Sequence, residues 1–238
     1  MRKSISLPEG TLDYELQRKR VKRLSLRVDA AGRVLVSAPR LLPLPLIERF
    51  ICSRKDWIEA RRTRALRAQA ADRAALREGG RLALWDETLT LRLQAGTRRR
   101  VERRENEVWI SLPDPTDEEQ TRRAIEQWRK AECEKRLTVI CRELYPHFAA
   151  RGIAFPRLSF RRMKSRWGSC RVQAGALSFN TRLTELPLVC AEYVAAHELT
   201  HFLHPNHSPA FYAELARVLP DWKERRAIIR AWEKEHPM

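Results

Sequence analysis

Two histidines four residues apart, with a glutamate directly after the first, constrain this chain more than any other feature. His197, Glu198 and His201 form the pattern His-Glu-x-x-His. An α-helix places residues i and i+4 on one face, about one turn apart, so both imidazoles can reach a single ion. The surrounding residues, among them Val194 and Leu199, are apolar or small. This setting favours a buried, metal-bearing helix over the alternative of an amphipathic helix whose histidines hold no metal.

The pattern also predicts a reaction. Zinc binds neutral imidazole nitrogens, and a site with three protein ligands keeps a fourth position for water, whose pKa falls towards neutrality on the metal. Glu198 would lie beside that water as the general base. We therefore expect a hydrolase with a zinc cofactor, in which His197 and His201 are two of the metal ligands.

The third ligand has three candidates, His204, His207 and Glu214, all further along the chain. His204 lies too far from the first histidine, because seven residues of continued helix span about 10 Å and zinc–nitrogen bonds measure about 2 Å. Pro205 disfavours a helical conformation at His204, so we expect the helix to end near Leu203 and the chain to turn back. That turn favours His207.

A second helix is predicted directly after this turn. Ser208 suits the N-cap position and Pro209 the first helical position. Glu214 lies on this helix and remains an alternative to His207 as the third ligand. His204 is interpreted as a loop residue or as a residue that contacts a ligand.

Two longer motifs make the pattern more specific. KSRWGSC spans Lys164–Cys170 and precedes a short strand that ends in Asn180, and HELTHFLHPNHSPAFY spans His197–Tyr212. Together these segments resemble the YgjP-like family of metal-dependent hydrolases, which are relatives of the SprT-like and small gluzincin-type peptidases. The resemblance covers most of the chain and is strongest over residues 160–226.

The resemblance implies a zincin-type metallopeptidase that acts on a peptide or protein. It implies that the metal ligands are His197, His201 and His207 and that Glu198 is the catalytic glutamate. The strand Leu177–Asn180 looks similar to the sheet edge along which zincins hold an extended substrate.

Three residues near these motifs are candidate substrate-binding residues. Asn180 ends the strand just described, and Lys164 and Arg166 precede it in the chain. The two basic side chains suit a substrate carboxylate or phosphate, or an oxyanion formed in the reaction, whereas the alternative for basic residues near a turn is simple solvation. Trp167 is expected to anchor its loop in the core.

Positive charge is concentrated in the first part of the chain. The formal net charge is +17, and residues 1–100 hold 24 Lys and Arg against 11 Asp and Glu. Such a field attracts polyanions, so nucleic acid or a nucleotide is a plausible partner of the basic N-terminal region.

This charge leaves two alternatives to a peptidase. The first is a metal-dependent nucleoside triphosphate pyrophosphatase, against which the lack of a clear acidic cluster for magnesium counts. The second is a nucleic-acid-binding protein with a structural zinc, a site that normally takes four protein ligands.

The hydrophobic periodicity predicts an α+β fold with two parts. We expect a basic, β-rich N-terminal region over residues 1–114, with a strand hairpin within residues 12–38 and a long basic helix from about Leu44 to Arg77. A small zincin-type metallohydrolase domain is expected over residues 115–238, with a short sheet, the active-site helix and further helices. No internal repeat is visible in the sequence.

Cysteine usage and hydropathy exclude other classes. The five cysteines contain no Cys-x-x-Cys pair, which argues against a disulfide framework and against a thiolate zinc site. No apolar run reaches transmembrane length, and the opening stretch is too polar for a secretory signal. We therefore expect a globular, cytoplasmic protein with no membrane partner.

Overall fold

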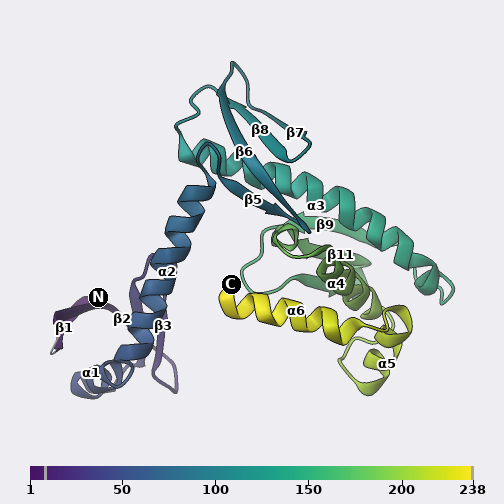
Figure 1. The fold of residues 1–238 in the computed structure, drawn as a ribbon. Helices are drawn as coiled ribbons and strands as arrows, with labels where there is room; N and C mark the ends of the chain where they lie inside the picture. The colour runs from purple at the N-terminus through teal and green to yellow at the C-terminus, as the bar shows by residue number, and fades with distance from the viewer. Residues whose placement is uncertain (8–9, 237–238) are drawn as a thin grey trace. The chain divides into compact units, whose positions relative to one another are not determined.

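The computed structural model describes residues 1–7 and 10–236, and its fold is mixed α+β with several small sheets and six α-helices (Figure 1). Contacts between Cα atoms divide the chain into two compact units, Met1–Ala75 and Leu76–Met238. The boundary predicted after residue 114 lies inside the second unit and stays a prediction. No helix in the described part of the chain is both long and apolar enough to cross a membrane.

The first unit consists of a four-stranded sheet followed by two helices. Its strands lie in the order β1-β2-β4-β3, with β2 and β4 parallel at the centre and the outer pairs antiparallel. The elements are β1 (Arg2–Leu7), β2 (Gly10–Lys19), β3 (Ser25–Val28), β4 (Val34–Pro39), α1 (Leu44–Cys52) and α2 (Lys55–Ala75).

The sheet of this unit buries one face. In β4, every second residue from Val34 to Ala38 is buried, and the residues that alternate with them are only partly buried. This period of two is expected of a strand with one covered face. Ile47 and Ile51, four residues apart on α1, and Ile58 on α2 complete the same core. The unit therefore has an apolar centre of its own.

The hairpin predicted within residues 12–38 is present as β3 and β4. Its turn contains Gly32 at φ +76, and the Asp29 carboxylate accepts hydrogen bonds from the N–H groups of Ala31 and Arg33. The earlier part of the predicted run forms the separate strand β2, which pairs with β4 in parallel.

The single helix predicted from Leu44 to Arg77 is divided in two. The break follows Cys52, where the hydroxyl of Ser53 donates to the carbonyl oxygen of Phe50 at 2.8 Å. A serine side chain that bonds a nearby carbonyl competes with continued helix. The second half of α2 is exposed on all sides, as expected for its Arg-rich sequence.

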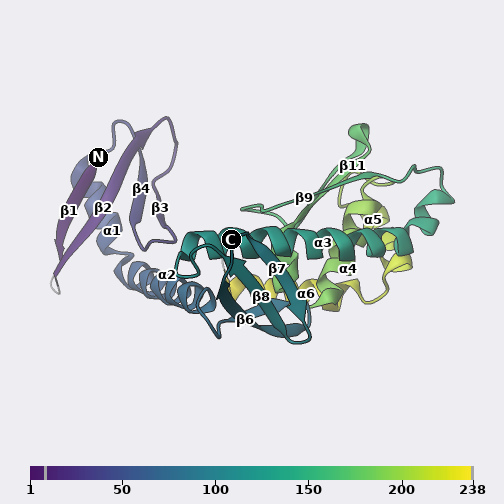
Figure 2. The ribbon, with the colours of Figure 1, turned by 90° about the horizontal axis from the view of Figure 1, so that it is seen from above.

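The second unit contains two sheets and four helices, which Figure 2 shows from a second direction. Its elements are β5 (Arg81–Leu84), β6 (Glu87–Ala95), β7 (Arg100–Arg104), β8 (Glu107–Leu112), α3 (Glu118–Ala149), β9 (Arg157–Arg161), β10 (Gly168–Arg171), β11 (Ala176–Asn180), α4 (Leu188–Thr200), α5 (Pro209–Val218) and α6 (Trp222–Glu235). Two 3₁₀ helices, η1 (Val172–Ala174) and η2 (Thr181–Glu185), flank β11. Helix α3 begins after Asp117, whose side chain caps it by accepting from the N–H groups of Glu119 and Gln120.

The four-stranded sheets of the two units share one topology. The second has the order β5-β6-β8-β7, with β6 and β8 parallel at the centre and antiparallel outer pairs, as in the first. Each sheet is followed along the chain by a helix. The structure thus contains a repeated topology that the sequence does not display.

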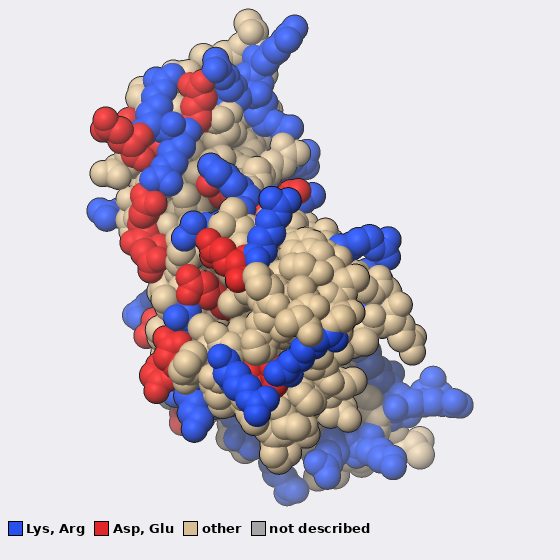
Figure 3. Space-filling model, turned by 90° about the vertical axis from the view of Figure 1, so that its right-hand side faces the viewer, with Lys and Arg blue, Asp and Glu red and all other residues tan. Residues whose placement is uncertain are grey.

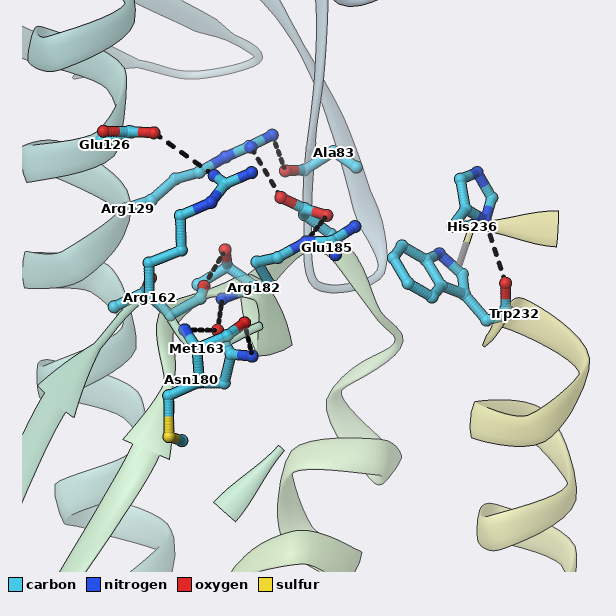
Figure 4. A network of polar contacts seen from close by, with 12 residues as sticks. Ala83, Glu126, Arg129, Arg162, Met163, Asn180, Arg182, Glu185, Trp232 and His236 are labelled. Carbon is cyan, nitrogen blue, oxygen red and sulfur yellow. Dashed lines mark hydrogen bonds and ion pairs between the residues drawn. The ribbon is translucent and has the colours of Figure 1, made fainter. Parts of the chain in front are cut away.

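The turn between β5 and β6 contacts the helical part of the second unit. Trp85, at φ 56, donates its N–H to the carbonyl oxygen of Thr184 at 2.7 Å. Asp86 accepts from the N–H of Leu188 at 3.2 Å, and Arg129 of α3 reaches the carbonyl oxygen of Ala83, a contact that Figure 4 shows. These bonds connect the sheet directly to the start of α4.

The three-stranded sheet lies beside α4 and has the order β10-β11-β9. All five residues of β11 are buried, and α4 packs against α3, α5 and α6. Figures 1 and 2 show α4 and α6 side by side. The core of the second unit therefore surrounds the helix that carries the His-Glu-x-x-His pattern.

Basic residues dominate the first unit. Residues 1–75 hold 18 Lys and Arg against 8 Asp and Glu. On the face of the molecule in Figure 3, basic side chains are interspersed with acidic ones, and broad uncharged areas lie between them.

Candidate metal centre

The three predicted histidine ligands come together in space. His197 lies in the last turn of α4, His201 directly follows that helix, and His207 precedes the N-cap of α5. One nitrogen from each imidazole forms a group in which all atoms lie within 4.8 Å of one another. Phe211, which is fully buried, contacts all three rings, with centroid distances of 5.0, 4.8 and 4.9 Å. An aromatic ring from α5 thus forms the floor of the cluster.

The turn after α4 brings His207 back to the helix. The helix ends at Thr200, three residues earlier than expected, and the N–H of His204 bonds the carbonyl oxygen of Thr200 at 3.0 Å. The predicted N-cap is present, because the Ser208 hydroxyl accepts from the N–H of Phe211. The Nε2 atoms of His207 and His197 consequently lie 3.0 Å apart.

His204 contributes a backbone group to the cluster. Its carbonyl oxygen lies 3.2 Å from Nδ1 of His201. Because a carbonyl only accepts hydrogen bonds, this contact places the proton on Nδ1 and leaves the lone pair on Nε2 of His201. The His204 backbone therefore fixes the tautomer of its neighbour.

The protein holds His197 and His201 as neutral imidazoles. Burial, together with the nearby His201, His207 and Arg226, lowers the pKa of His197 to about 3. Burial also lowers the pKa of His201. Nδ1 of His197 is buried and has no hydrogen-bond partner among the described residues.

Glu198 lies next to the cluster in a closely fitted position. Its side chain is 7% exposed, and a Cβ atom on Gly168 would lie 2.6 Å from its Cγ and Oε1 atoms. Burial raises the pKa of Glu198 to about 7, against the opposing effects of Arg166 and a hydrogen bond from the backbone N–H of Cys170. Gly168 and Cys170 both belong to β10, so this strand positions the carboxyl group.

A cleft of about 770 Å³ opens at the cluster. One side is formed by β10 and the residues before it, another by α4 and the third by α6. Basic residues line two of these sides: Arg166 before β10, and Arg226 and Arg230 on α6. The indole N–H of Trp167 donates to Glu233 of α6 at 2.8 Å, so the loop and the helix are bonded to each other.

The candidate substrate-binding residues lie in different surroundings. Arg166 is exposed and lines the cleft, while Lys164 is exposed and lies outside the described cleft lining. Asn180 is fully buried, and its amide bonds both backbone groups of Met163 (Figure 4). The same amide donates to the carbonyl oxygen of Arg166. This geometry favours a role for Asn180 in holding the segment that carries Arg166.

The strand Leu177–Asn180 is not a sheet edge. It lies in β11, which pairs with β10 on one side and β9 on the other, so the predicted edge position is wrong. The sequence does not distinguish the two positions, because a central strand and an edge strand can both be short and apolar. The edge strand at the cleft is β10, whose sequence has no hydrophobic alternation.

Glu214, the alternative third ligand, is engaged elsewhere. Its carboxylate is 2% exposed and bonds His147, Arg151 at 2.7 Å and Arg217 at 3.2 Å. The metal-binding group found among the described residues contains His207 and not Glu214.

Several cleft residues were not predicted. Gly168, Tyr193, Arg226 and Arg230 all line the cleft beside the histidines. The spacing of Arg226 and Arg230, four residues apart on an amphipathic helix, places them on one face, but the sequence does not show which face meets α4.

Comparisons with known proteins identify the family of the chain. The family described as YgjP-like, metallopeptidase domain matches residues 22–231. Among solved structures, the crystal structure of the metallopeptidase zymogen of Pyrococcus abyssi abylysin is similar, with 16% sequence identity and a TM-score of 0.37, over 42% of this chain and 94% of that chain. No curated protein matches. Because the family match spans most of the chain, the protein belongs to the YgjP-like family of metallopeptidase domains and is a metal-dependent hydrolase.

Proposed function

We propose that this protein is a zinc-dependent metallopeptidase in which His197, His201 and His207 hold the metal and Glu198 is the general base. The observation that carries the proposal is the convergence of three imidazole nitrogens within 4.8 Å, directly beside a buried glutamate. The family supplies the metal-dependent hydrolytic class, and a peptidase family favours a peptide or protein as substrate.

The residues present fit a zinc ion. Three imidazoles are a donor set that zinc prefers, and two nitrogens bound to one tetrahedral zinc lie about 3.3 Å apart for bonds of about 2 Å. The 3.0 Å separation of the Nε2 atoms of His197 and His207 is close to that value. The hydrogen bond from His201 to the His204 carbonyl is of the type that orients metal-binding histidines.

The site is open on one side. No fourth His, Cys, Asp or Glu joins the three histidines in the described part of the chain. A structural zinc normally takes four protein ligands, so this donor set opposes a purely structural metal. The described residues also contain no second group with metal-ligand spacing, which disfavours a magnesium-dependent pyrophosphatase.

The residues around the site suit peptide hydrolysis. A bound zinc would supply a Lewis acid that polarises the scissile carbonyl and makes water more acidic. Glu198 would take a proton from the attacking water and pass it to the leaving amine, and burial has already placed its pKa at about 7, near working pH. Gly168 and Cys170 would hold that carboxylate in place during both transfers.

An extended peptide fits the edge of β10. This strand pairs with β11 on one side only and lines the cleft with its residues from Gly168 to Cys170. Backbone hydrogen bonds to a sheet edge give affinity that depends little on sequence. We therefore propose β10, in place of the strand first predicted, as the substrate-binding edge.

The proposal is tested by metal content and hydrolysis together. Wild-type protein and Glu198→Gln would be loaded with zinc and assayed on unfolded proteins, peptides and nucleoside triphosphates. One bound zinc in each protein, with cleavage of peptides by the wild type alone, is the expected result. Equal activity of the two proteins, or hydrolysis of nucleotides only, would contradict the proposal. Nucleic-acid or nucleotide binding by the basic N-terminal region over residues 1–114 stays a separate prediction.

A further inference from the structure

The side of the cleft formed by α6 is positively charged. Arg226 and Arg230 are four residues apart on this helix, so their side chains leave the same face of it about one turn apart. Both line the cleft together with His197 and Glu198. Tyr193 of α4 lines the cleft across from them.

Neither arginine is paired within the described part of the chain. No hydrogen bond or ion pair joins Arg226 or Arg230 to residues 1–7 or 10–236, although Arg226 is half-buried. The preceding residue behaves differently, because Arg225 bonds both Glu192 and Asp221. Arg225 therefore holds α6 in place, whereas Arg226 presents its charge to the cleft.

The helix that carries these charges is held in place. Arg225 connects its first turns to α4 through Glu192, and Glu233 near its end accepts the indole N–H of Trp167. Ile229, between the two cleft arginines, is buried in the core. Arg226 and Arg230 thus extend from a fixed support, which lowers the cost of ordering a bound ligand.

The two acidic residues of the described cleft lining, Glu198 and Glu233, form no ion pair with either arginine. Glu198 accepts a hydrogen bond from the backbone of Cys170, and Glu233 accepts one from the indole of Trp167. The guanidinium groups of Arg226 and Arg230, which have no carboxylate partner among the described residues, suit a ligand oxyanion. Arginine binds carboxylates through paired hydrogen bonds.

We infer that Arg226 and Arg230 form a carboxylate-binding subsite that selects peptides with an acidic group close to the cleaved bond. This inference rests on the peptidase function proposed above. The acidic group is either an Asp or Glu side chain or the terminal carboxylate of the peptide, since both present the same chemistry to the two guanidinium groups.

Binding to an inactive protein tests the subsite without relying on turnover. Full-length, zinc-loaded Glu198→Gln would be titrated against fluorescent hexapeptides capped at both ends, with one glutamate moved along an otherwise neutral sequence. Glutamine replaces the glutamate in matched peptides, and a glutamine peptide capped only at its N-terminus offers a terminal carboxylate alone. Fluorescence anisotropy at fixed salt gives each Kd.

The expected result is that one glutamate position, or the free terminus, binds about tenfold more tightly than its neutral match. Adding Arg226→Gln should remove that preference, so that the glutamate peptide and its glutamine match bind with equal Kd. Arg226→Glu should reverse it in favour of lysine peptides, a gain that a misfolded variant cannot produce. Lys223→Gln, an equal charge change on α6 outside the described cleft lining, should keep the preference.

Equal affinity for every matched pair would overturn the inference, and so would a preference that survives replacement of both arginines by glutamine. Cleavage by the wild type separates this failure from failure of the proposed function. If the wild type cleaves acidic and neutral peptides equally and Glu198→Gln cleaves neither, the peptidase stands and the subsite is rejected. If the wild type binds and cleaves no peptide, both are rejected.

Discussion

The Asp86 carboxylate accepts a hydrogen bond from the backbone N–H of Leu188 at 3.2 Å, across 102 residues of sequence. Leu188 is the first residue of α4, and the N-cap residue of that helix, Pro187, makes no side-chain hydrogen bond. A negative charge at this end also interacts favourably with the helix dipole. The helix that carries His197 and Glu198 is thus capped by the turn between β5 and β6.

Removal of this cap should destabilise the protein. Asp86→Ala is expected to lower the free energy of unfolding by about 1 kcal/mol, the usual cost of losing an N-cap acceptor. Asp86→Asn should retain most of the stability, because asparagine caps helices as well as aspartate does. Urea denaturation of the three proteins measures the difference, and an alanine variant as stable as the wild type would show that the cap contributes nothing.

The same contacts predict where the chain can be shortened. A chain that starts at Leu76 should fold cooperatively, whereas one that starts at residue 115 should not, because it lacks Asp86 and the carbonyl oxygen of Ala83 that Arg129 bonds. Thermal unfolding followed by circular dichroism would compare the two. A sharp transition in the shorter chain would instead support the domain boundary predicted from the sequence.

A single methyl group on β10 should separate catalysis from metal binding. In Gly168→Ala the new Cβ would lie 2.6 Å from Cγ and Oε1 of Glu198, so the carboxyl group must move. We expect peptide hydrolysis to fall by about 100-fold, as small displacements of a catalytic group can cause, with one zinc still bound. Ser169→Ala on the same strand adds no atom and serves as the control. Loss of zinc together with activity would show that Gly168 supports the whole site.

His204 and His207 should differ in their effect on metal affinity. His207→Ala removes one of the three converging nitrogens and should weaken zinc binding by at least about 100-fold. His204→Ala should bind zinc almost normally, since the carbonyl oxygen that bonds His201 belongs to the backbone. Competition with a chromogenic chelator gives both affinities, and the reverse order would exchange the roles of the two residues.

The Glu214 carboxylate should make the free energy of unfolding depend on pH. Burial opposes its charge, but hydrogen bonds from His147 and Arg151 outweigh that effect and lower the pKa of its carboxyl group. Because the folded pKa lies below the unfolded one, the stabilisation is complete above the ordinary glutamate pKa of about 4.3 and is lost as pH falls below it. Glu214→Gln should therefore be less stable than the wild type by about 2 kcal/mol at pH 7.

The test of this ion-pair cluster compares the stability of wild type and Glu214→Gln at two pH values. Chemical denaturation at pH 7 and pH 3.5 should show a gap between wild type and Glu214→Gln that narrows at the lower pH. A gap of constant size would assign the effect to packing or to hydrogen bonds that do not need the charge.

The metal cluster could be anticipated because its information is local. His197 and His201 share one helix, and the turn that returns His207 is specified by Pro205 before it and Ser208 after it. The assignment of metal and base roles to these residues stays a prediction until metal content is measured. The residues of the cleft walls were harder to predict from the sequence, because the placement of Gly168 and Arg226 depends on how β10 and α6 pack on α4.

The same distinction explains what was missed in the fold. The α+β class and the helix start at Ser208 follow from local patterns, and they are present. Strand β7 is rich in arginine and lacks apolar alternation, so only its pairing with β8 makes it a strand. The shared order of the two four-stranded sheets depends on parallel pairing between distant segments, which no local pattern encodes.

Helix α6 follows the three histidines in the chain, so the ribosome makes it after them. The three histidines leave the ribosome before Arg226 and before Glu233, the partner of Trp167. A nascent chain that has emerged through residue 207 already contains all three candidate ligands, but one side of its cleft has not yet been made. Metal capture could therefore precede completion of the cleft, and with the subsite proposed above the nascent chain would become selective only when α6 docks.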